Sequence, residues 1–242
     1  SYLIMQSICG IIAYLITSKY FKRSIPESII WALTVALSNH VTLLLPITEI
    51  YFQQNVITQV ASIILMDGII LLSVIAFFLE LSTKKNVNLF NFIKNLFLNP
   101  FILSIIIGLL FLLLNFNIDQ TPIEYTLSKL AACVSPVGLF AIGITLSFYT
   151  KNVINKLSVS ISVLKLVISP IILLLIGLVI FNAGLPAEIP GAFFVSVAPC
   201  GVTSIVLCAA YNVSPENIIK AIFVSTIASI GTIFFAIKYL TL

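Results

Sequence analysis

Charged residues are scarce in this 242-residue chain, because they make up only 8% of it. Soluble domains carry about 25% charged residues, so this chain has too few to cover a water-facing surface. The net charge of +4 comes from basic residues that are scattered singly between apolar runs. They form no basic stripe with interleaved aromatic residues, and we therefore expect no nucleic-acid partner.

The sequence also lacks the motifs of catalytic and metal sites. Its four cysteines include no C-x-x-C, and each lies inside an apolar run, which indicates small packing residues rather than a disulfide or metal site. Neither H-E-x-x-H nor G-x-S-x-G occurs, and only one aspartate clearly lies within an apolar run, where an aspartyl dyad needs two. An intramembrane enzyme is thus disfavoured, and we expect no catalytic residue, cofactor or metal.

Long apolar runs dominate the sequence instead. Hydrophobic residues make up 60% of the chain and the mean hydropathy is +1.21. Runs of this length cross about 30 Å of hydrocarbon, and lipid offers no hydrogen bonds to open backbone, so the runs must be helices. The sequence predicts an all-α integral membrane protein with about eight transmembrane helices, at residues 2–17, 28–51, 56–79, 98–115, 122–149, 157–181, 189–211 and 216–240.

Loop charges predict the orientation of these spans. Basic residues follow the first, third and fifth spans, as Lys19, Lys22, Arg23, Lys84, Lys85, Lys94, Lys151 and Lys156. Acidic residues occupy the intervening loops, as Glu49, Asp119, Glu124 and Glu188. The positive-inside rule then places Ser1 outside and the segment from Glu80 to Phe97 in the cytoplasm. We expect a multi-pass protein of the cytoplasmic membrane.

An inverted repeat is the next expectation. Spans six to eight repeat the order of spans one to three: an ordinary helix, a helix interrupted near its centre, and a closing helix, in opposite orientation. Residues 1–80 would be the remainder of a first repeat with three helices, 81–97 a cytoplasmic connecting loop, and 98–242 a second repeat with five helices. A five-plus-five arrangement of ten helices needs two more helices before Ser1, which suggests a fragment or truncated relative of a ten-helix transporter.

Two broken helices carry the main functional signal. The second span contains Ser38-Asn39-His40-Val41-Thr42 before Pro46, and the seventh contains Pro199-Cys200-Gly201. The second half of each broken helix would present free N–H groups and a positive dipole end to the bundle centre, which suits an anion. The alternative is a pair of simple proline kinks, in which serine, threonine or neighbouring helices satisfy the freed carbonyl groups.

Ionisable residues within the spans are the second signal. Asp67 lies mid-span and is either a site for a coupling proton or cation or a hydrogen-bond anchor between helices. His40 could titrate near neutral pH, but as the only histidine it is interpreted as a neutral packing group. Lys165 could face the interior, yet it is close enough to the cytoplasmic end of its span for the side chain to snorkel to the membrane surface. Lys129 is expected at the membrane interface.

The same residues resemble the auxin efflux carrier family, which includes plant auxin exporters and bacterial malate or malonate carriers. The matching features are Ser38-Asn39 with Pro46, Asn99-Pro100, the run Pro136-Val137-Gly138-Leu139-Phe140-Ala141-Ile142-Gly143, Pro199, and Ala209-Ala210-Tyr211. His40-Val41-Thr42 departs from the family pattern, in which small residues and glycine are usual. The resemblance implies a fold like that of sodium–bile acid symporters, in which two broken helices cross at a central site.

That resemblance implies a substrate site lined by Asn39, Pro46, Pro199 and Gly201. We expect His40 and Cys200, which neighbour these residues in the sequence, to contribute to the same site. The Asn39 amide suits a carboxylate, although capping the broken helix is an equal alternative. The predicted function is secondary transport of small organic anions, such as mono- and dicarboxylates, by alternating access. A channel and a non-transporting truncated membrane fragment are the alternatives. Expected partners are the organic anion, a proton or sodium ion, the lipid bilayer and a second copy of the chain.

Overall fold

The computed structural model describes residues 1–83, 89–98, 100–149, 152–181 and 189–241. These residues form α-helices and π-helical turns, and no named strand occurs among them, which agrees with the predicted all-α fold. The elements of the first half are α1 (Tyr2–Leu15), η1 (Ile16–Tyr20), α2 (Ile25–Ala36), η2 (His40–Leu44), α3 (Leu45–Tyr51), α4 (Gln54–Met66), η3 (Asp67–Leu71), α5 (Leu72–Thr83), α6 (Leu89–Phe97) and α7 (Pro100–Leu113). Those of the second half are α8 (Pro122–Ser147), α9 (Lys156–Val163), η4 (Leu164–Ile168), α10 (Ser169–Phe181), α11 (Pro190–Ser196), α12 (Thr203–Ala210) and α13 (Glu216–Thr241).

Five helical stretches in the described part of the chain are long and apolar enough to cross a membrane. They are Tyr2–Tyr20, Gln54–Thr83, Pro122–Thr145, Lys156–Ile180 and Glu216–Thr241. Shorter apolar helices, Ile25–Ala36 and Ile102–Leu113, lie in two further predicted spans. The composition and these helices together show a multi-pass membrane protein, while a total of eight crossings stays a prediction.

The segment predicted as a connecting loop is partly helical. Within residues 81–97, the sequence from Leu89 to Phe97 forms α6. Phe90, Ile93 and Phe97 recur at helical spacing, and this apolar periodicity explains why the segment folds as a helix. The predicted boundary charges Lys84, Lys85, Lys151 and Glu188 lie outside the described residues.

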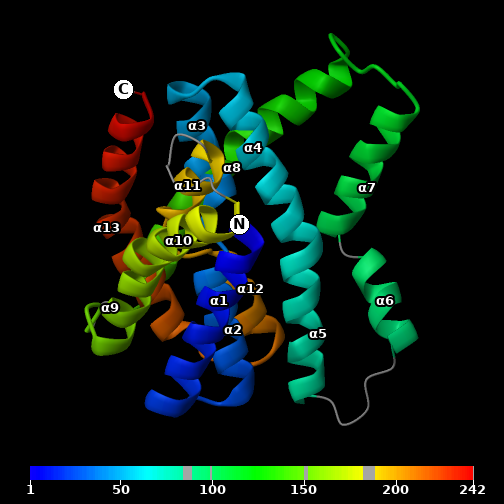
Figure 1. Ribbon diagram of the computed structural model, residues 1–242. Coiled ribbons are helices and arrows are strands. Elements are labelled where there is room, and N and C mark those ends of the chain that lie inside the picture. Colours follow the sequence, from blue (N-terminus) through cyan, green and yellow to red (C-terminus); the bar gives the residue numbers. More distant parts are fainter. Residues whose placement is uncertain (84–88, 99, 150–151, 182–188, 242) are drawn as a thin grey trace.

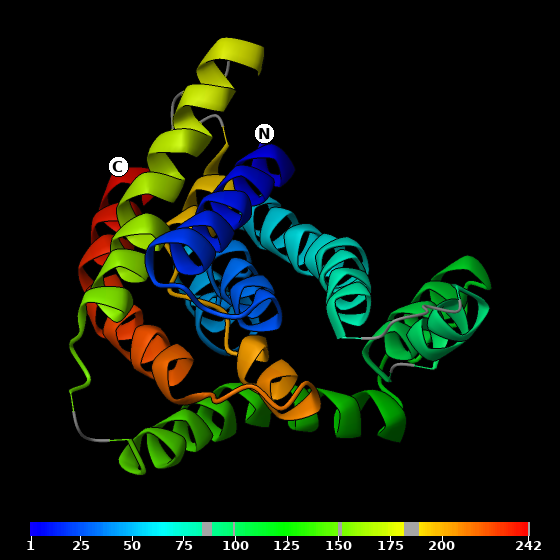
Figure 2. The same cartoon turned by 90° about the horizontal axis from the view of Figure 1, so that it is seen from below.

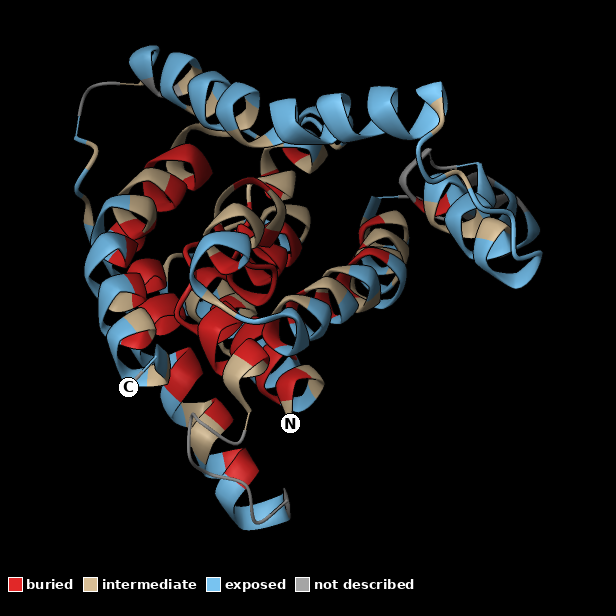
Figure 3. Cartoon of the chain, turned by 90° about the horizontal axis from the view of Figure 1, so that it is seen from above, coloured by how far each residue is buried: buried red, intermediate tan, exposed pale blue. Residues whose placement is uncertain are grey.

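A buried centre is surrounded by exposed outer helices. Figure 3 shows the buried residues gathered where α1, α2 and α9 to α13 meet, with α8 exposed along most of its length. Trp31, Leu33 and Phe194 are fully buried in this centre. Figure 2 shows α6 and α7 standing apart at one side, whereas α8 crosses the bundle. The exposed helix faces are apolar, as a lipid-facing surface requires.

Three π-helical turns interrupt the long helices near the centre. η2 begins at His40, η3 begins at Asp67, and η4 contains Lys165. A π-helical turn widens the helix by one residue and occurs frequently at functional sites. The polar and charged residues singled out in the sequence therefore lie where the helices are least regular.

Candidate functional site

Two broken helices run in opposite directions through the centre of the molecule. The first consists of α2, a break at Leu37 to Asn39, and then η2 with α3. The second consists of α11, a break at residues 197–202, and then α12. In Figure 1, α2 lies low and α3 high, whereas α11 lies high and α12 low. The predicted interruptions are thus present, and the two helices pass each other in opposite senses.

The two breaks are joined by backbone hydrogen bonds. Ser38 and Cys200 form an isolated antiparallel bridge. The Asn39 N–H donates to the Pro199 carbonyl at 3.0 Å, and the Gly201 N–H donates to the Thr34 carbonyl at 3.2 Å. Because each break exposes backbone groups that lipid cannot satisfy, each supplies partners to the other.

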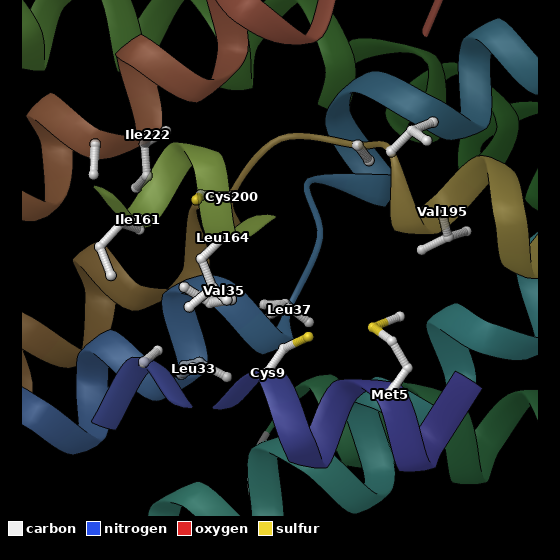
Figure 4. Close-up of a cluster of buried hydrophobic side chains, with 14 of the residues drawn as sticks. Met5, Cys9, Leu33, Val35, Leu37, Ile161, Leu164, Val195, Cys200 and Ile222 are labelled. Carbon is white, nitrogen blue, oxygen red and sulfur yellow. The ribbon is translucent and has the colours of Figure 1, made fainter. Parts of the chain in front are cut away.

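The crossing leaves no room for a side chain at Gly201. A Cβ atom added there would lie 2.8 Å from the Leu37 carbonyl oxygen and from two Leu37 side-chain carbons. Figure 4 shows Leu37 and Cys200 within the buried apolar cluster that encloses the crossing. Cys200 contributes to the crossing mainly through its backbone. Its N–H donates to Ser225 Oγ at 3.2 Å, whereas its thiol side chain is fully buried.

Each proline of the motifs frees a carbonyl that a serine then satisfies. Proline has no N–H for the carbonyl four residues earlier. Pro199 cannot donate to the Val195 carbonyl, which accepts from Ser38 Oγ at 2.9 Å and from the Ala198 N–H at 3.3 Å. Pro46 frees the Thr42 carbonyl, which accepts from Ser135 Oγ at 2.6 Å and so attaches α8 to η2. At both prolines, a serine thus satisfies the carbonyl, as the alternative of simple proline kinks expects. The breaks in the two helices are present as well.

Pro46 itself does not lie at the first break. It occupies the second position of α3, after η2, where the first turn of a helix tolerates its missing N–H. The break lies earlier, at Leu37 to Asn39, because Leu37 already has an extended backbone. Pro199, Cys200 and Gly201, in contrast, all lie within the second break.

Asn39 carries a buried donor that has no partner. Its side chain is 3% exposed, and its Oδ1 atom accepts from Thr42 Oγ1. Its Nδ2 atom has no hydrogen-bond partner among the described residues. Asn39 precedes η2 but makes no side-chain capping bond, so capping is not what its amide does here. An unpaired buried donor costs about 1–3 kcal/mol, which makes this amide a candidate for binding an acceptor.

Lys165 lies at the crossing and not at the membrane surface. Its side chain is 1% exposed, and Nζ donates to Ser38 Oγ at 2.7 Å. The prediction that Lys165 snorkels is therefore wrong. η4 lies in the middle of the helical stretch from α9 to α10 and packs against α1 and α2, which directs the ammonium to the centre. Lys129 is exposed, with its ammonium 5.3 Å from the Tyr125 ring centre, and its place at the membrane interface stays a prediction.

Asp67 is the centre of a buried hydrogen-bond cluster. Oδ1 accepts from Gln6 Nε2 at 2.6 Å, and Oδ2 accepts from the Tyr2 hydroxyl at 3.3 Å. His40 Nε2 lies 2.9 Å from Oδ2. The sequence analysis treated Asp67 and His40 separately and did not identify Tyr2 or Gln6. Because Tyr2 and Gln6 lie on one face of α1 at i and i+4, their polarity in an apolar helix was the available signal.

The site combines a buried ammonium, a carboxylate–imidazole pair and an unpaired amide where two broken helices cross. Among the described residues, no group of histidine, cysteine, aspartate and glutamate side chains could hold a metal ion. Broken helices that cross in opposite directions within an apolar bundle are typical of secondary transporters. The fold and the site therefore have the features of a membrane transporter.

Sequence comparison gives the family. A family model described as membrane transport protein matches residues 1–237, so the chain belongs to this family, which is that of the auxin efflux carriers. The family consists of membrane transporters and not of enzymes. No curated protein matches the chain.

Proposed function

We propose that this protein is a secondary transporter of small organic anions, such as mono- and dicarboxylates, that binds its substrate beside Asn39 where the broken helices cross. The observation that carries the proposal is the unpaired, buried Asn39 amide donor at the junction of the two breaks. An amide N–H directed to no protein acceptor is available to a carboxylate oxygen of a substrate. Family membership supports the transport function itself.

The charge of the crossing favours an anion. Lys165 adds a buried ammonium next to Ser38, the residue that precedes Asn39. Helical structure begins again at His40 and at Thr203, and each of these helix N-termini adds a partial positive charge. From the sequence, helix ends were expected to supply most of the positive potential, and the position of Lys165 strengthens this part of the proposal. A weakly coordinated carboxylate can also be released, as transport requires.

Alternating access is the proposed mechanism. The opposite directions of the two broken helices, and the order of helices around them, support an inverted repeat of spans one to three and six to eight. In such a repeat, rocking of one part against the other exposes a fixed central site to each side in turn. The cytoplasmic membrane, the orientation from the positive-inside rule, and a homodimer remain parts of this proposal.

Uptake by proteoliposomes that contain the full-length protein tests the proposal. We expect saturable uptake of radiolabelled pyruvate, malate or malonate, and counterflow when the vesicles are preloaded with the unlabelled anion. Radiolabelled tetraethylammonium should not be taken up. Uptake of the cation without any of the carboxylates would contradict the anion assignment, and a non-saturating flux without counterflow would indicate a channel.

A further inference from the structure

We infer that the coupling ion of this transporter is a proton, held jointly by Asp67 and His40 and taken up together with one substrate carboxylate. This inference rests on the proposed transport function and adds the identity, the site and the stoichiometry of the coupling ion. His40 Nε2 and Asp67 Oδ2 lie 2.9 Å apart, and both side chains are more than nine-tenths buried. Histidine is the side chain that ordinarily exchanges a proton between pH 5 and 8.

The surroundings of Asp67 exclude sodium. Sodium, like other hard cations, is bound by several oxygen ligands. Here the carboxylate is contacted by an amide nitrogen, a hydroxyl donor and an imidazole nitrogen. The orientation of the Gln6 amide is fixed, because Nε2 also donates to the Ala36 carbonyl at 3.2 Å and both of its partners are acceptors. Donors on all sides stabilise a carboxylate or a shared proton, but they offer no ligand to a metal cation.

His40 has an open position for the proton. With Nε2 directed at Asp67, its Nδ1 atom is buried and has no partner in the described part of the chain. When the pair holds no extra proton, the Nε2–H group donates to the carboxylate and Nδ1 bears a free lone pair. An incoming proton binds to this lone pair or to the carboxylate, and the pair titrates as a unit. The net charge of the pair then changes from −1 to 0.

Charge balance couples this proton to the substrate. With Lys165 as an ammonium, the crossing is neutral when it holds neither proton nor anion. A carboxylate alone would make it negative, and a proton alone would make it positive. Either charge is costly inside an apolar bundle. The state that holds both is neutral again, so proton and carboxylate bind together, and each raises the affinity for the other.

Two cavities border the side chains that donate to Asp67. The lower cavity has a volume of about 630 Å³ and is lined by Gln6, Tyr14, Ile25 and Ser82, among others. The upper cavity has a volume of about 470 Å³ and is lined by Tyr2, Thr58, Gln59 and Ile189, among others. Gln6 faces the first and Tyr2 the second, and both donate to Asp67.

Few other ionisable groups face the pair. Tyr2 does so from α1 and Lys165 from η4, while Cys9 and Cys200 lie near Lys165. Tyrosine and cysteine ordinarily exchange protons above neutral pH, so Tyr2, Cys9 and Cys200 keep their protons at neutral pH.

Proteoliposomes with the membrane potential clamped at zero test this inference. With one proton per anion, an inward proton gradient of about one pH unit should concentrate radiolabelled pyruvate, malate or malonate roughly tenfold. A sodium gradient at equal pH should give no accumulation. Protein-free vesicles give the background. Accumulation driven by sodium, or an anion distribution that ignores the pH gradient, overturns the inference while leaving the transport function intact.

Asp67→Asn tests the position of the coupling proton. The amide keeps the shape of the side chain and removes the negative charge that attracts a proton to the pair, so gradient-driven accumulation of the anion should be lost. Asp119→Asn, in an exposed loop, is the matched control and should accumulate anion like the wild type. If Asp67→Asn still accumulates the anion roughly tenfold, the proton site lies elsewhere. Absence of counterflow from the wild type would contradict the transport function. If the Asp67→Asn protein does not reach the membrane, the comparison of sodium and proton gradients in the wild type tests the inference.

Discussion

His40 Nε2 lies 2.9 Å from Asp67 Oδ2, and this contact joins the first broken helix to the middle of the next membrane-spanning stretch. The two residues are 27 positions apart, and each begins a π-helical turn. Tyr2 and Gln6 complete the cluster from α1. The contact therefore connects the first broken helix to a buried carboxylate on the neighbouring helical stretch.

The first prediction concerns the stability of this pair. His40→Ala removes one of three donors to a buried carboxylate, which should cost about 1.5–3 kcal/mol of unfolding free energy. In the background of Asp67→Asn the same change should cost much less, because no charge then remains to be stabilised. A double-mutant cycle of thermal unfolding in detergent measures the difference. Equal costs in both backgrounds would show that the two side chains do not interact.

The second prediction concerns the contact between the breaks. Gly201→Ala places a methyl group 2.8 Å from the Leu37 carbonyl, so the two backbones must separate. Overpacking of this kind costs about 1–3 kcal/mol, and we expect lower thermal stability and loss of anion uptake. Gly231→Ala is the control, since nothing lies within 4 Å of its added Cβ and α13 is helical there. A Gly201→Ala protein with wild-type uptake would contradict the close crossing.

The third prediction concerns Lys165. Lys165→Met replaces a buried ammonium with an apolar side chain of similar length, which should leave folding nearly unchanged. The affinity for the anion should fall roughly ten- to a hundredfold, because a charged donor near the crossing is lost. Concentration dependence of initial uptake rates measures the change, with exposed Lys129→Met as the control. Unchanged affinity in Lys165→Met would remove this ammonium from the electrostatics of the site.

The fourth prediction concerns orientation. In a background without native cysteines, Asn152→Cys should react with a membrane-impermeant maleimide only from the cytoplasmic side, and Asn117→Cys only from outside. Both positions are exposed and lie in connections between helices. The opposite labelling pattern would overturn the orientation derived from the basic loops, and labelling of both positions from one side would contradict the inverted repeat.

Composition and motif position predicted the class and the broken helices well. Apolar length and the polar residues between the runs located every described helix except α6, and Pro199 with Gly201 located the second break. Pro46 lies beyond the first break, in the first turn of α3. A proline is also suited to the first turn of a helix, and the sequence does not distinguish a residue at a break from one just beyond it.

The contacts of the site were not predictable from the sequence. Whether His40 meets Asp67, and whether Lys165 points inward, depends on helix rotation, and each π-helical turn shifts that rotation after its extra residue. Its closeness to the cytoplasmic end of the span favoured a snorkelling Lys165, whereas the structure directs the ammonium to Ser38. Side-chain partners separated by many residues follow from packing, which one sequence does not give.

The most direct measurement is equilibrium binding of the transported carboxylate to wild-type protein and to Asn39→Ala, by scintillation proximity with the radiolabelled anion. If Asn39 Nδ2 donates to the anion at the crossing, Asn39→Ala should bind it roughly ten- to a hundredfold more weakly while its thermal stability stays near that of the wild type. Asn117→Ala, in an exposed connection, should bind like the wild type. Equal affinity in wild type and Asn39→Ala would place the substrate elsewhere in the protein.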